Sequence, residues 1–247
     1  MAETDWNEAD DGLDVASLLG GVTAGETPPN GGGTFVYGFR SAAAVTGARA
    51  KVTNQVDYYP ITTPASAGGG SISGAIKRGV SPVTTGFAPL FFIGAQAGGP
   101  PPPSVLDNAY ILGLEDNEPH RVVLRKGRIT DGVPAATAEN ALMRSLATET
   151  VDTWWHIMLD MIVNLSGDVV LRVFRNDLSV NLVTAPVWEE LEMEGATDGI
   201  NGFIDDSLGA SSGSLPYLDG YTGFAGQVSA QGRRMYFDQI VIARQLP

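Results

Sequence analysis

The sequence predicts an all-β protein, an antiparallel β-sandwich of the jelly-roll type with at most one short helix. The main indication is a hairpin, in which the alternating runs Thr153–Val163 and Val169–Arg175 flank the turn Asn164–Asp168. A further apolar strand, Met235–Arg244, closes the chain. Strands joined by tight turns pair antiparallel, so these segments indicate a sheet without crossover helices.

The composition suits this fold class. The chain has 247 residues, of which 43% are hydrophobic, and it contains 31 glycines, 15 prolines and no cysteine. Turn residues at this frequency fit many short strands, and this length is enough for one large β-domain. Without cysteine, stability cannot rest on disulfides or a thiolate zinc site. No apolar run is long enough for a membrane span, so we expect no membrane partner.

Residues 1–33 are expected to form an extended N-terminal arm, and residues 34–247 the sandwich. The arm is acidic at first and then rich in Gly and Pro, which is the composition of a linker. Its one apolar element contains Val15, Leu18 and Leu19. We expect these three side chains to dock the arm on a neighbouring subunit.

Strand patterns begin at Thr34 and recur every 8–15 residues. The expected strands before the hairpin are 35–39, 50–59, 71–78, 90–94, 109–114 and 120–127. Only 138–147 reads as a helix, because Leu142 and Leu146 are four residues apart in an Ala-rich segment. These elements predict a sandwich or barrel and no solenoid.

The hairpin alternation also predicts which residues form the core, because alternate residues of a strand share a face. One face of the first strand is uniformly apolar and is expected to meet the opposing sheet; it consists of Trp155, Ile157, Leu159, Met161 and Val163. The other face is mixed and is expected to meet solvent or a partner; it contains His156, Met158, Asp160 and Ile162. Leu171 and Val173 are expected to extend the apolar layer across the turn.

The net charge of −13 is concentrated in two blocks. Residues 1–39 contain seven acidic and no basic side chains, and the stretch between Arg175 and Arg233 contains nine acidic and no basic ones. Such blocks repel phosphate, so we expect no nucleic-acid partner. They form either a solvated face or a patch that meets a basic partner.

Seven segments recur in an order that resembles a known family. They are SISGAIKRG, PLFFIGAQ, AYILGLED, PHRVVLRKGRI, WWHIMLDMIVNLSGDVVLRVFRND, GYTGFAGQ and MYFDQIVIAR. Over residues 34–247 the order is similar to that of the concanavalin A-like lectin/glucanase, or laminin G-like, jelly rolls. The resemblance implies this fold, and it implies functions that include lectins, glycoside hydrolases, carbohydrate-binding modules and structural domains of bacteriophage particles.

The run Glu190–Glu194 is a candidate catalytic site. In a strand, Glu190, Glu192 and Glu194 would share one face. The run resembles the E-x-D-x-E pattern of jelly-roll glucanases, whose paired carboxylates cleave a glycosidic bond. Here Glu192 replaces the Asp, and the run follows the hairpin instead of preceding it. We therefore expect an acidic edge or loop, and we assign no catalytic residue.

Two binding sites are further candidates. The oxygen-rich stretch 198–206 could hold Ca²⁺, but its spacing fits no EF-hand loop, so we expect a solvated turn and no cofactor or metal. Sugar stacking on aromatic rings is the other candidate. The candidate glycan contacts are Tyr58, Tyr59, Trp188, Tyr217 and Tyr221. Tyr110, Trp154 and Trp155 could also stack on a sugar, although sandwich aromatics more often pack internally.

The expected function is structural. An acidic arm on a bare jelly roll, without a secretion signal or a complete catalytic set, is typical of a virion protein. We expect a capsid decoration protein or a tail or baseplate subunit of a bacteriophage, located in the virion and not an enzyme. Its expected partners are other virion proteins and copies of itself. The alternatives are a lectin-like domain that binds host glycan and, third, a glycoside hydrolase.

Overall fold

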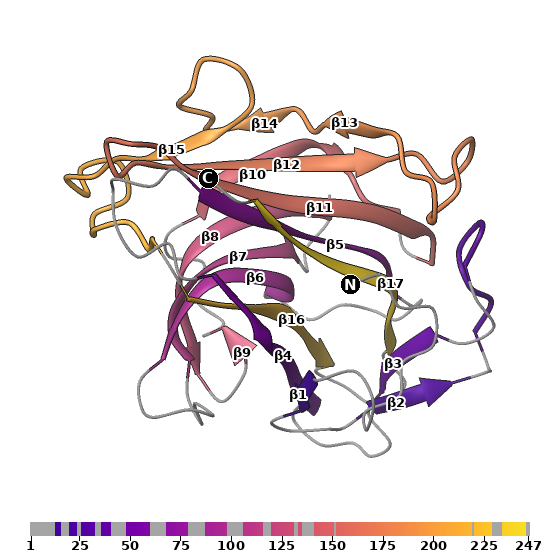
Figure 1. Ribbon diagram of the computed structural model, residues 1–247. Helices are drawn as coiled ribbons and strands as arrows, with labels where there is room; N and C mark the ends of the chain where they lie inside the picture. Colours follow the sequence, from indigo (N-terminus) through magenta and orange to yellow (C-terminus); the bar gives the residue numbers. More distant parts are fainter. Residues whose placement is uncertain are drawn as a thin grey trace.

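The computed structural model describes residues 13–15, 20–23, 26–32, 36–40, 48–59, 68–78, 87–97, 106–115, 120–130, 133–134, 141–150, 152–218, 220–228 and 234–245. These residues form two antiparallel sheets stacked as a sandwich (Figure 1). No helix occurs among them, and hence none that could cross a membrane. The all-β prediction is therefore confirmed.

The first sheet has nine strands. They are β1 (Leu13–Val15), β4 (Ala48–Tyr59), β6 (Phe87–Ala97), β7 (Leu106–Glu115), β8 (Arg121–Thr130), β9 (Val133–Pro134), β10 (Ala141–Thr148), β14 (Met193–Glu194) and β16 (Gly220–Val228). Their spatial order is β1-β4-β16-β6-β7-β8-β10-β14, and β9 also pairs with β8. The strands expected at 50–59, 90–94, 109–114 and 120–127 are β4, β6, β7 and β8 of this sheet, with shifted bounds. Those expected at 35–39 and 71–78 lie in the second sheet.

The second sheet has eight strands. They are β2 (Gly20–Thr23), β3 (Val36–Arg40), β5 (Gly68–Arg78), β11 (Trp154–Val163), β12 (Val169–Asn176), β13 (Trp188–Glu190), β15 (Phe203–Asp205) and β17 (Arg234–Gln245). Their order is β13-β12-β11-β5-β17-β3-β2, with β15 also paired to β12. The chain passes repeatedly between the sheets, as from β10 to β11, so neither sheet can form alone.

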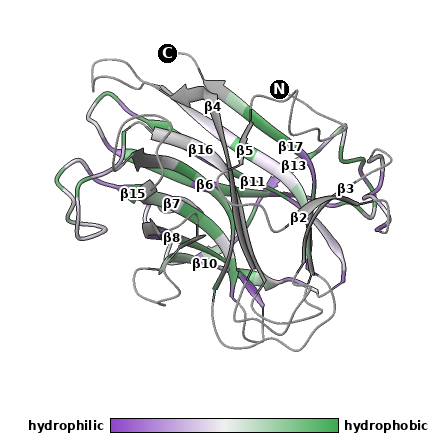
Figure 2. Cartoon of the chain, turned by 90° about the horizontal axis from the view of Figure 1, so that it is seen from below, coloured by the Kyte–Doolittle hydropathy of each residue, from purple (hydrophilic) through white to green (hydrophobic). Residues whose placement is uncertain are grey.

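The main core lies between the two sheets, and the hairpin supplies much of it. Trp155, Ile157, Leu159, Met161 and Val163 are all buried in one hydrophobic cluster. Leu159 is paired with Val173 and Met161 with Leu171, as the alternation predicts. Phe237 of β17 completes this layer and contacts Phe91 and Phe224 of the opposing sheet. Hydrophobic residues run along β6, β7 and β17 (Figure 2).

A second, smaller cluster lies on the other face of the nine-stranded sheet. It contains Phe87, Phe92, Ala109, Ile111 and Val123. These residues alternate with those that face the main core, such as Tyr110 and Leu112 of β7. The nine-stranded sheet is therefore apolar on both faces along β6, β7 and β8.

The predicted helix at 138–147 is wrong, because residues 141–148 form β10 and pair with β8 and β14. Met143 and Ser145 point inward, whereas Leu146 is exposed. A spacing of four places Leu142 and Leu146 on one face of a strand as well as of a helix, since four is an even number. The segment forms a strand and not a helix because pairing with β8 and β14 satisfies its backbone N–H and C=O groups.

The predicted arm is placed in part on the sandwich of its own chain. Residues 13–15 pair with β4, and residues 20–23 pair with β3. Val15 lies in β1, where the structure describes the backbone but not the side chain, and Leu18 and Leu19 lie outside the described residues. Docking of this element on another subunit stays a prediction.

Residues 26–32 cross the face of the eight-stranded sheet that is turned away from the main core, the outer face. Lys77 Nζ of β5 lies 2.7 Å from Glu26 Oε1, and the indole Nε1 of Trp154 donates to the Thr27 carbonyl. Farther along, Val183 N donates to the Asn30 carbonyl at 2.8 Å. These contacts tie a segment of linker-like composition to β5, β11 and the loop after β12.

Candidate functional surfaces

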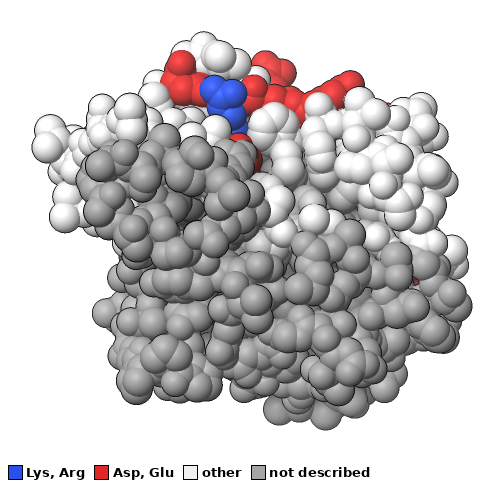
Figure 3. Space-filling model, in the orientation of Figure 1, with Lys and Arg blue, Asp and Glu red and all other residues white. Residues whose placement is uncertain are grey.

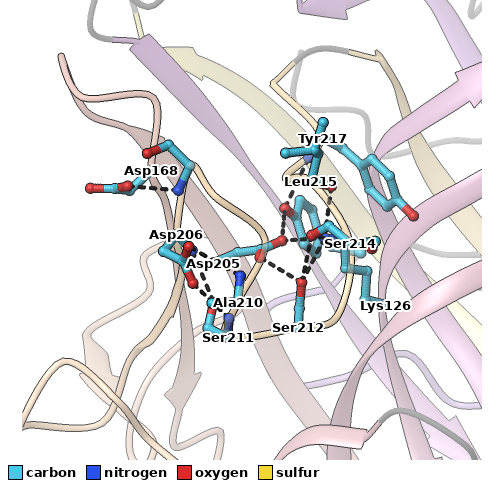
Figure 4. Close-up of polar contacts among 12 residues, drawn as sticks. Lys126, Asp168, Asp205, Asp206, Ala210, Ser211, Ser212, Ser214, Leu215 and Tyr217 are labelled. Carbon is cyan, nitrogen blue, oxygen red and sulfur yellow. Dashed lines mark hydrogen bonds and ion pairs between the residues drawn. The ribbon is translucent and has the colours of Figure 1, made fainter.

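A buried ion pair joins the two sheets at the end of the sandwich where β15 lies. Lys126 of β8 donates from Nζ to Asp205 Oδ2 of β15 at 2.6 Å, and the two side chains are 3% and 0% exposed (Figure 4). Nζ also donates to Ser212 Oγ and to the carbonyls of Ser214 and Leu215, at 2.7, 2.7 and 2.8 Å. Four oxygens thus compete for the three N–H groups of one ammonium. Burial lowers the pKa of Lys126, and Asp205 opposes this shift.

Two tyrosines complete this cluster. Tyr110 Oη donates to Asp205 Oδ2 at 2.6 Å and accepts from the backbone N–H of Tyr217 at 3.0 Å. The rings of the two tyrosines lie 5.2 Å apart, and Lys126 Nζ lies 4.8 Å from the Tyr217 ring. Burial raises the pKa of Tyr110 far above its usual range, so its hydroxyl stays protonated as a donor. The cluster fixes residues 212–217 across the end of the sandwich.

The loop that follows β15 is folded around one carboxylate. Asp206 accepts from the backbone N–H groups of Leu208, Ala210 and Ser211. The Ser211 hydroxyl and then these backbone hydrogen bonds lower the pKa of Asp206 to about 2. Gly209 has φ +74, and a Cβ there would lie 2.7 Å from the Ser214 carbonyl carbon, so only glycine fits.

The same loop is joined to the hairpin turn. Ser207 N donates to Asp168 Oδ1 at 2.8 Å, and Asn164 Nδ2 donates to Asp168 Oδ2 at 2.9 Å. The Asn164 and Ser207 hydrogen bonds lower the pKa of Asp168. Asp168 and Asp206 are therefore both anionic near neutral pH, and each is held by uncharged donors.

The carboxylates of the calcium candidate 198–206 do not converge on one point. Asp198 Oδ1 accepts from the backbone of Ile200 and Gly202, and its Oδ2 accepts from Arg172. Asp205 points into the sandwich toward Lys126, and Asp206 caps its own loop. Within the described ranges, no group of three His, Cys, Asp or Glu side chains could hold a metal ion. Protein donors occupy these oxygens instead.

The carboxylates of 190–194 do not share a strand, which corrects the line-up expected from their spacing. Glu190 ends β13 in the eight-stranded sheet, and Glu194 ends β14 in the nine-stranded sheet. Between them the chain crosses from one sheet to the other. Glu190 lies 3.6 Å from Arg172, and Glu194 lies 3.2 Å from Arg121. The geometry places no pair of these carboxylates across a common site, although acids do line this edge (Figure 3).

On the outer face, His156 is buried where the sequence predicted contact with solvent or a partner. The Trp188 ring covers it, with ring centroids 4.5 Å apart. Asn176 Oδ1 accepts from Val187 N, and its Nδ2 donates to the Leu182 carbonyl, so the amide orientation is fixed. His156 Nδ1, 2.9 Å from Asn176 Nδ2, must therefore accept, which leaves the proton on Nε2. Burial lowers the pKa of His156 to about 4.

Asp160 lies two residues farther along the same face and is also buried, again contrary to the sequence prediction. Burial raises its pKa to about 6, and the charge of Arg172 opposes this shift. Arg172 is the direct cross-strand neighbour of Asp160, and it also contacts Glu190 and Asp198. The positive charge of Arg172 thus acts on three carboxylates, those of Asp160, Glu190 and Asp198.

These two shifts predict opposite effects of pH on stability. The folded-state pKa of His156, about 4, lies below its ordinary 6.5. As the pH falls, the unfolded chain therefore takes up this proton first, and the stability of the fold decreases from pH 6.5 to pH 4. The folded-state pKa of Asp160, about 6, lies above its ordinary 3.8, so stability rises as pH falls through that range. Each effect is on the order of 3 kcal/mol.

We therefore expect the variants His156→Gln and Asp160→Asn to diverge. Relative to wild type, His156→Gln should gain stability from pH 6 to pH 4, and Asp160→Asn should lose it, each by about 2 kcal/mol. Urea unfolding at both pH values measures this. Parallel pH dependence of all three proteins would show that neither group titrates as its burial implies.

The glycan candidates are placed as follows. Tyr217 is half-buried against Tyr110, and Trp188 is half-buried over His156. Trp155 and Tyr110 belong to the core. The side chains of Tyr58, Tyr59 and Tyr221 lie outside the described residues, so sugar binding through them stays a prediction. In Tyr217 and Trp188, one face or edge of the ring already packs against another ring of the protein.

Sequence reasoning missed Lys126 and Asn176. Lys126 appeared only as a residue of a strand, and its partner Asp205 is 79 positions away. A lysine at an inward position, opposite Tyr110 in the paired strand, was the available signal, because a buried cation requires an acidic partner. Asn176 offered a weaker signal, as a polar residue at the end of an apolar strand.

Comparison with known proteins gives likeness of fold only. No protein-family model and no curated protein matches the sequence. Among solved structures, the marine PL-14 alginate lyase from Aplysia kurodai has 9% identity and a TM-score of 0.51, covering 93% of this chain and 87% of its own. Peanut lectin has 10% identity and a TM-score of 0.48, covering 100% and 96%. A carbohydrate esterase from the Shiga toxin-encoding bacteriophage phi24B has 10% identity and a TM-score of 0.46, covering 95% and 90%.

Lectins and carbohydrate-active enzymes both occur among these neighbours. At such low identity, their activities say nothing about this chain. The sheet order, the shared core and the likeness to the alginate lyase agree on the architecture. The chain therefore has an antiparallel β-sandwich fold of the jelly-roll type, similar to that of the alginate lyase.

Proposed function

We propose that this chain is a non-enzymatic structural protein of a bacteriophage particle, a capsid decoration protein or a tail or baseplate subunit, and that it acts through protein–protein contacts. The observation that carries the proposal is the chemistry of its exposed apolar side chains. Among the described side chains, the nine large exposed hydrophobic ones are all aliphatic. They are Leu146, Ile162, Leu165, Val180, Leu182, Val187, Ile200, Leu208 and Leu215.

Aliphatic exposure favours protein partners over sugars. Sugar rings stack on flat aromatic faces, whereas protein interfaces bury apolar side chains of any shape. Among the described aromatic side chains none is exposed, and the half-buried ones are Trp154, Phe174, Trp188 and Tyr217. The carboxylates of 190–194 are divided between two sheet edges, so they supply no acid–base pair of the kind that glycoside hydrolysis uses.

The bacteriophage particle is the setting that the acidic N-terminal segment and the bare jelly roll suggest. In a symmetric particle, each contact is repeated many times, so modest contacts add up to stable attachment. The partners would be other virion proteins and copies of this chain, and its location would be the virion.

The test uses particles of the phage that encodes the chain, purified from a strain in which its gene is deleted. Added wild-type protein should sediment with these particles and saturate at a fixed number of copies per particle. No binding to the particles would refute the structural role. Saturable binding to an oligosaccharide array, with none to particles, would establish the lectin alternative in its place.

A further inference from the structure

Two turns meet at the β15 end of the sandwich, which we define as residues 164–168 and 206–215. Residues 164–168 lead into β12, and β15 pairs with the first three residues of that strand. The Ser207–Asp168 hydrogen bond joins the second turn to the first. Both turns present large aliphatic side chains that are 66% to 86% exposed. They are Leu165, Leu208 and Leu215.

The loop 206–215 is rigid for its length. The Asp206 carboxylate binds three of its backbone N–H groups, and Lys126 binds the carbonyls of Ser214 and Leu215. The backbone of Leu208, at 86% the most exposed large apolar side chain described, is therefore held by the hydrogen bonds of the loop, and its side chain is presented to solvent. Because the loop is already ordered, a partner that buries Leu208 meets little ordering cost.

The β15 end is also negatively charged. Asp168 and Asp206 are both held by uncharged donors. Lys126 is buried and is already paired with Asp205. The sequence between Arg175 and Arg233 contributes no Lys or Arg. A protein surface that covers these leucines must therefore bring positive charge to meet Asp168 and Asp206.

We infer that the β15 end is the docking surface of this chain, with Leu208 inserted into an apolar pocket of a positively charged protein surface on the particle. This inference rests on the proposed function and specifies where and how the attachment is made. Apolar anchors at the centre of an interface carry most of its binding energy, and the surrounding charges set orientation and association rate.

The test again uses particles that lack the chain. We compare wild type with Leu208→Ser and with Leu146→Ser, a matched control because Leu146 is a half-exposed leucine of β10 away from the β15 end. Leu208→Ser should bind at least about tenfold more weakly, and Leu146→Ser as wild type. Both variants should melt as wild type, since neither side chain belongs to the core. Wild-type affinity should also fall as salt is raised.

The outcomes separate the two proposals. Failure of wild type to bind would refute the structural function and this inference with it. Wild-type binding that Leu208→Ser leaves unchanged would refute only the docking surface. Binding that does not respond to salt would refute the positively charged partner. Equal weakening by both variants would show a general loss of apolar surface and would also overturn the role of Leu208.

Discussion

Replacing Asp205 by alanine is expected to lower the free energy of unfolding by about 3–5 kcal/mol, as for the loss of one partner of a buried ion pair. The Lys126 ammonium, 3% exposed, would stay in the interior without its counter-charge. Tyr110 and Ser212 would lose the carboxylate oxygens to which they donate. Chemical unfolding at neutral pH measures the change.

Two comparisons make this expectation specific. Glu192→Ala alters an exposed carboxylate of the same acidic stretch, so it should lower the free energy of unfolding much less. The double variant Lys126→Met/Asp205→Leu removes both charges and should be more stable than Asp205→Ala alone, because no unpaired ion is left inside. If Asp205→Ala and Glu192→Ala cost the same, the ion pair does not stabilise the junction of the sheets.

Leu159→Ala is expected to cost about 2–5 kcal/mol, through lost burial and the cavity that remains. Leu159 is fully buried in the main core and is paired with Ile72 and Val173 in the neighbouring strands. Both strands hold it in place, so the site can collapse only partly around the missing atoms. Thermal or urea unfolding of the purified chain gives the difference.

Ile162→Ala is the matched control. Ile162 lies in the same strand with its side chain on the outer face, and it is 36% exposed. Its truncation removes a similar volume from a surface that water already reaches, so the loss should be well below that of Leu159→Ala. Equal losses would mean that the register of β11 in the sandwich is not the one described.

The hairpin was predictable because its signals agree. Alternation, a polar turn and apolar residues on one face all place Leu159 and Val173 in the core, and they are found there. The burial of His156 and Asp160 was not predictable, because it depends on Trp188 and Arg172 from other strands. A strand pattern tells which face a residue takes, but not what covers that face.

The two failures on the acidic and Ala-rich segments have a common cause. Residues 141–148 pair with β8 and β14, and residues 188–194 pair with β12 and β10, so tertiary pairing decides the conformation of both segments. In the sequence, Leu142 and Leu146 fit a helix, and Glu190–Glu194 fits one continuous strand. The Lys126–Asp205 pair was hidden for another reason, since only the packed sandwich brings its two members together.

The crossing of residues 188–194 from one sheet to the other has a consequence for solubility. β13 ends the order of one sheet with three residues, and β14 ends the order of the other with two. Edges this short, flanked by the exposed carboxylates of Glu189, Glu192 and Glu194, are poor templates for strand addition by a second chain. Many copies can therefore be crowded together without fusing their sheets along this side into amyloid-like fibres.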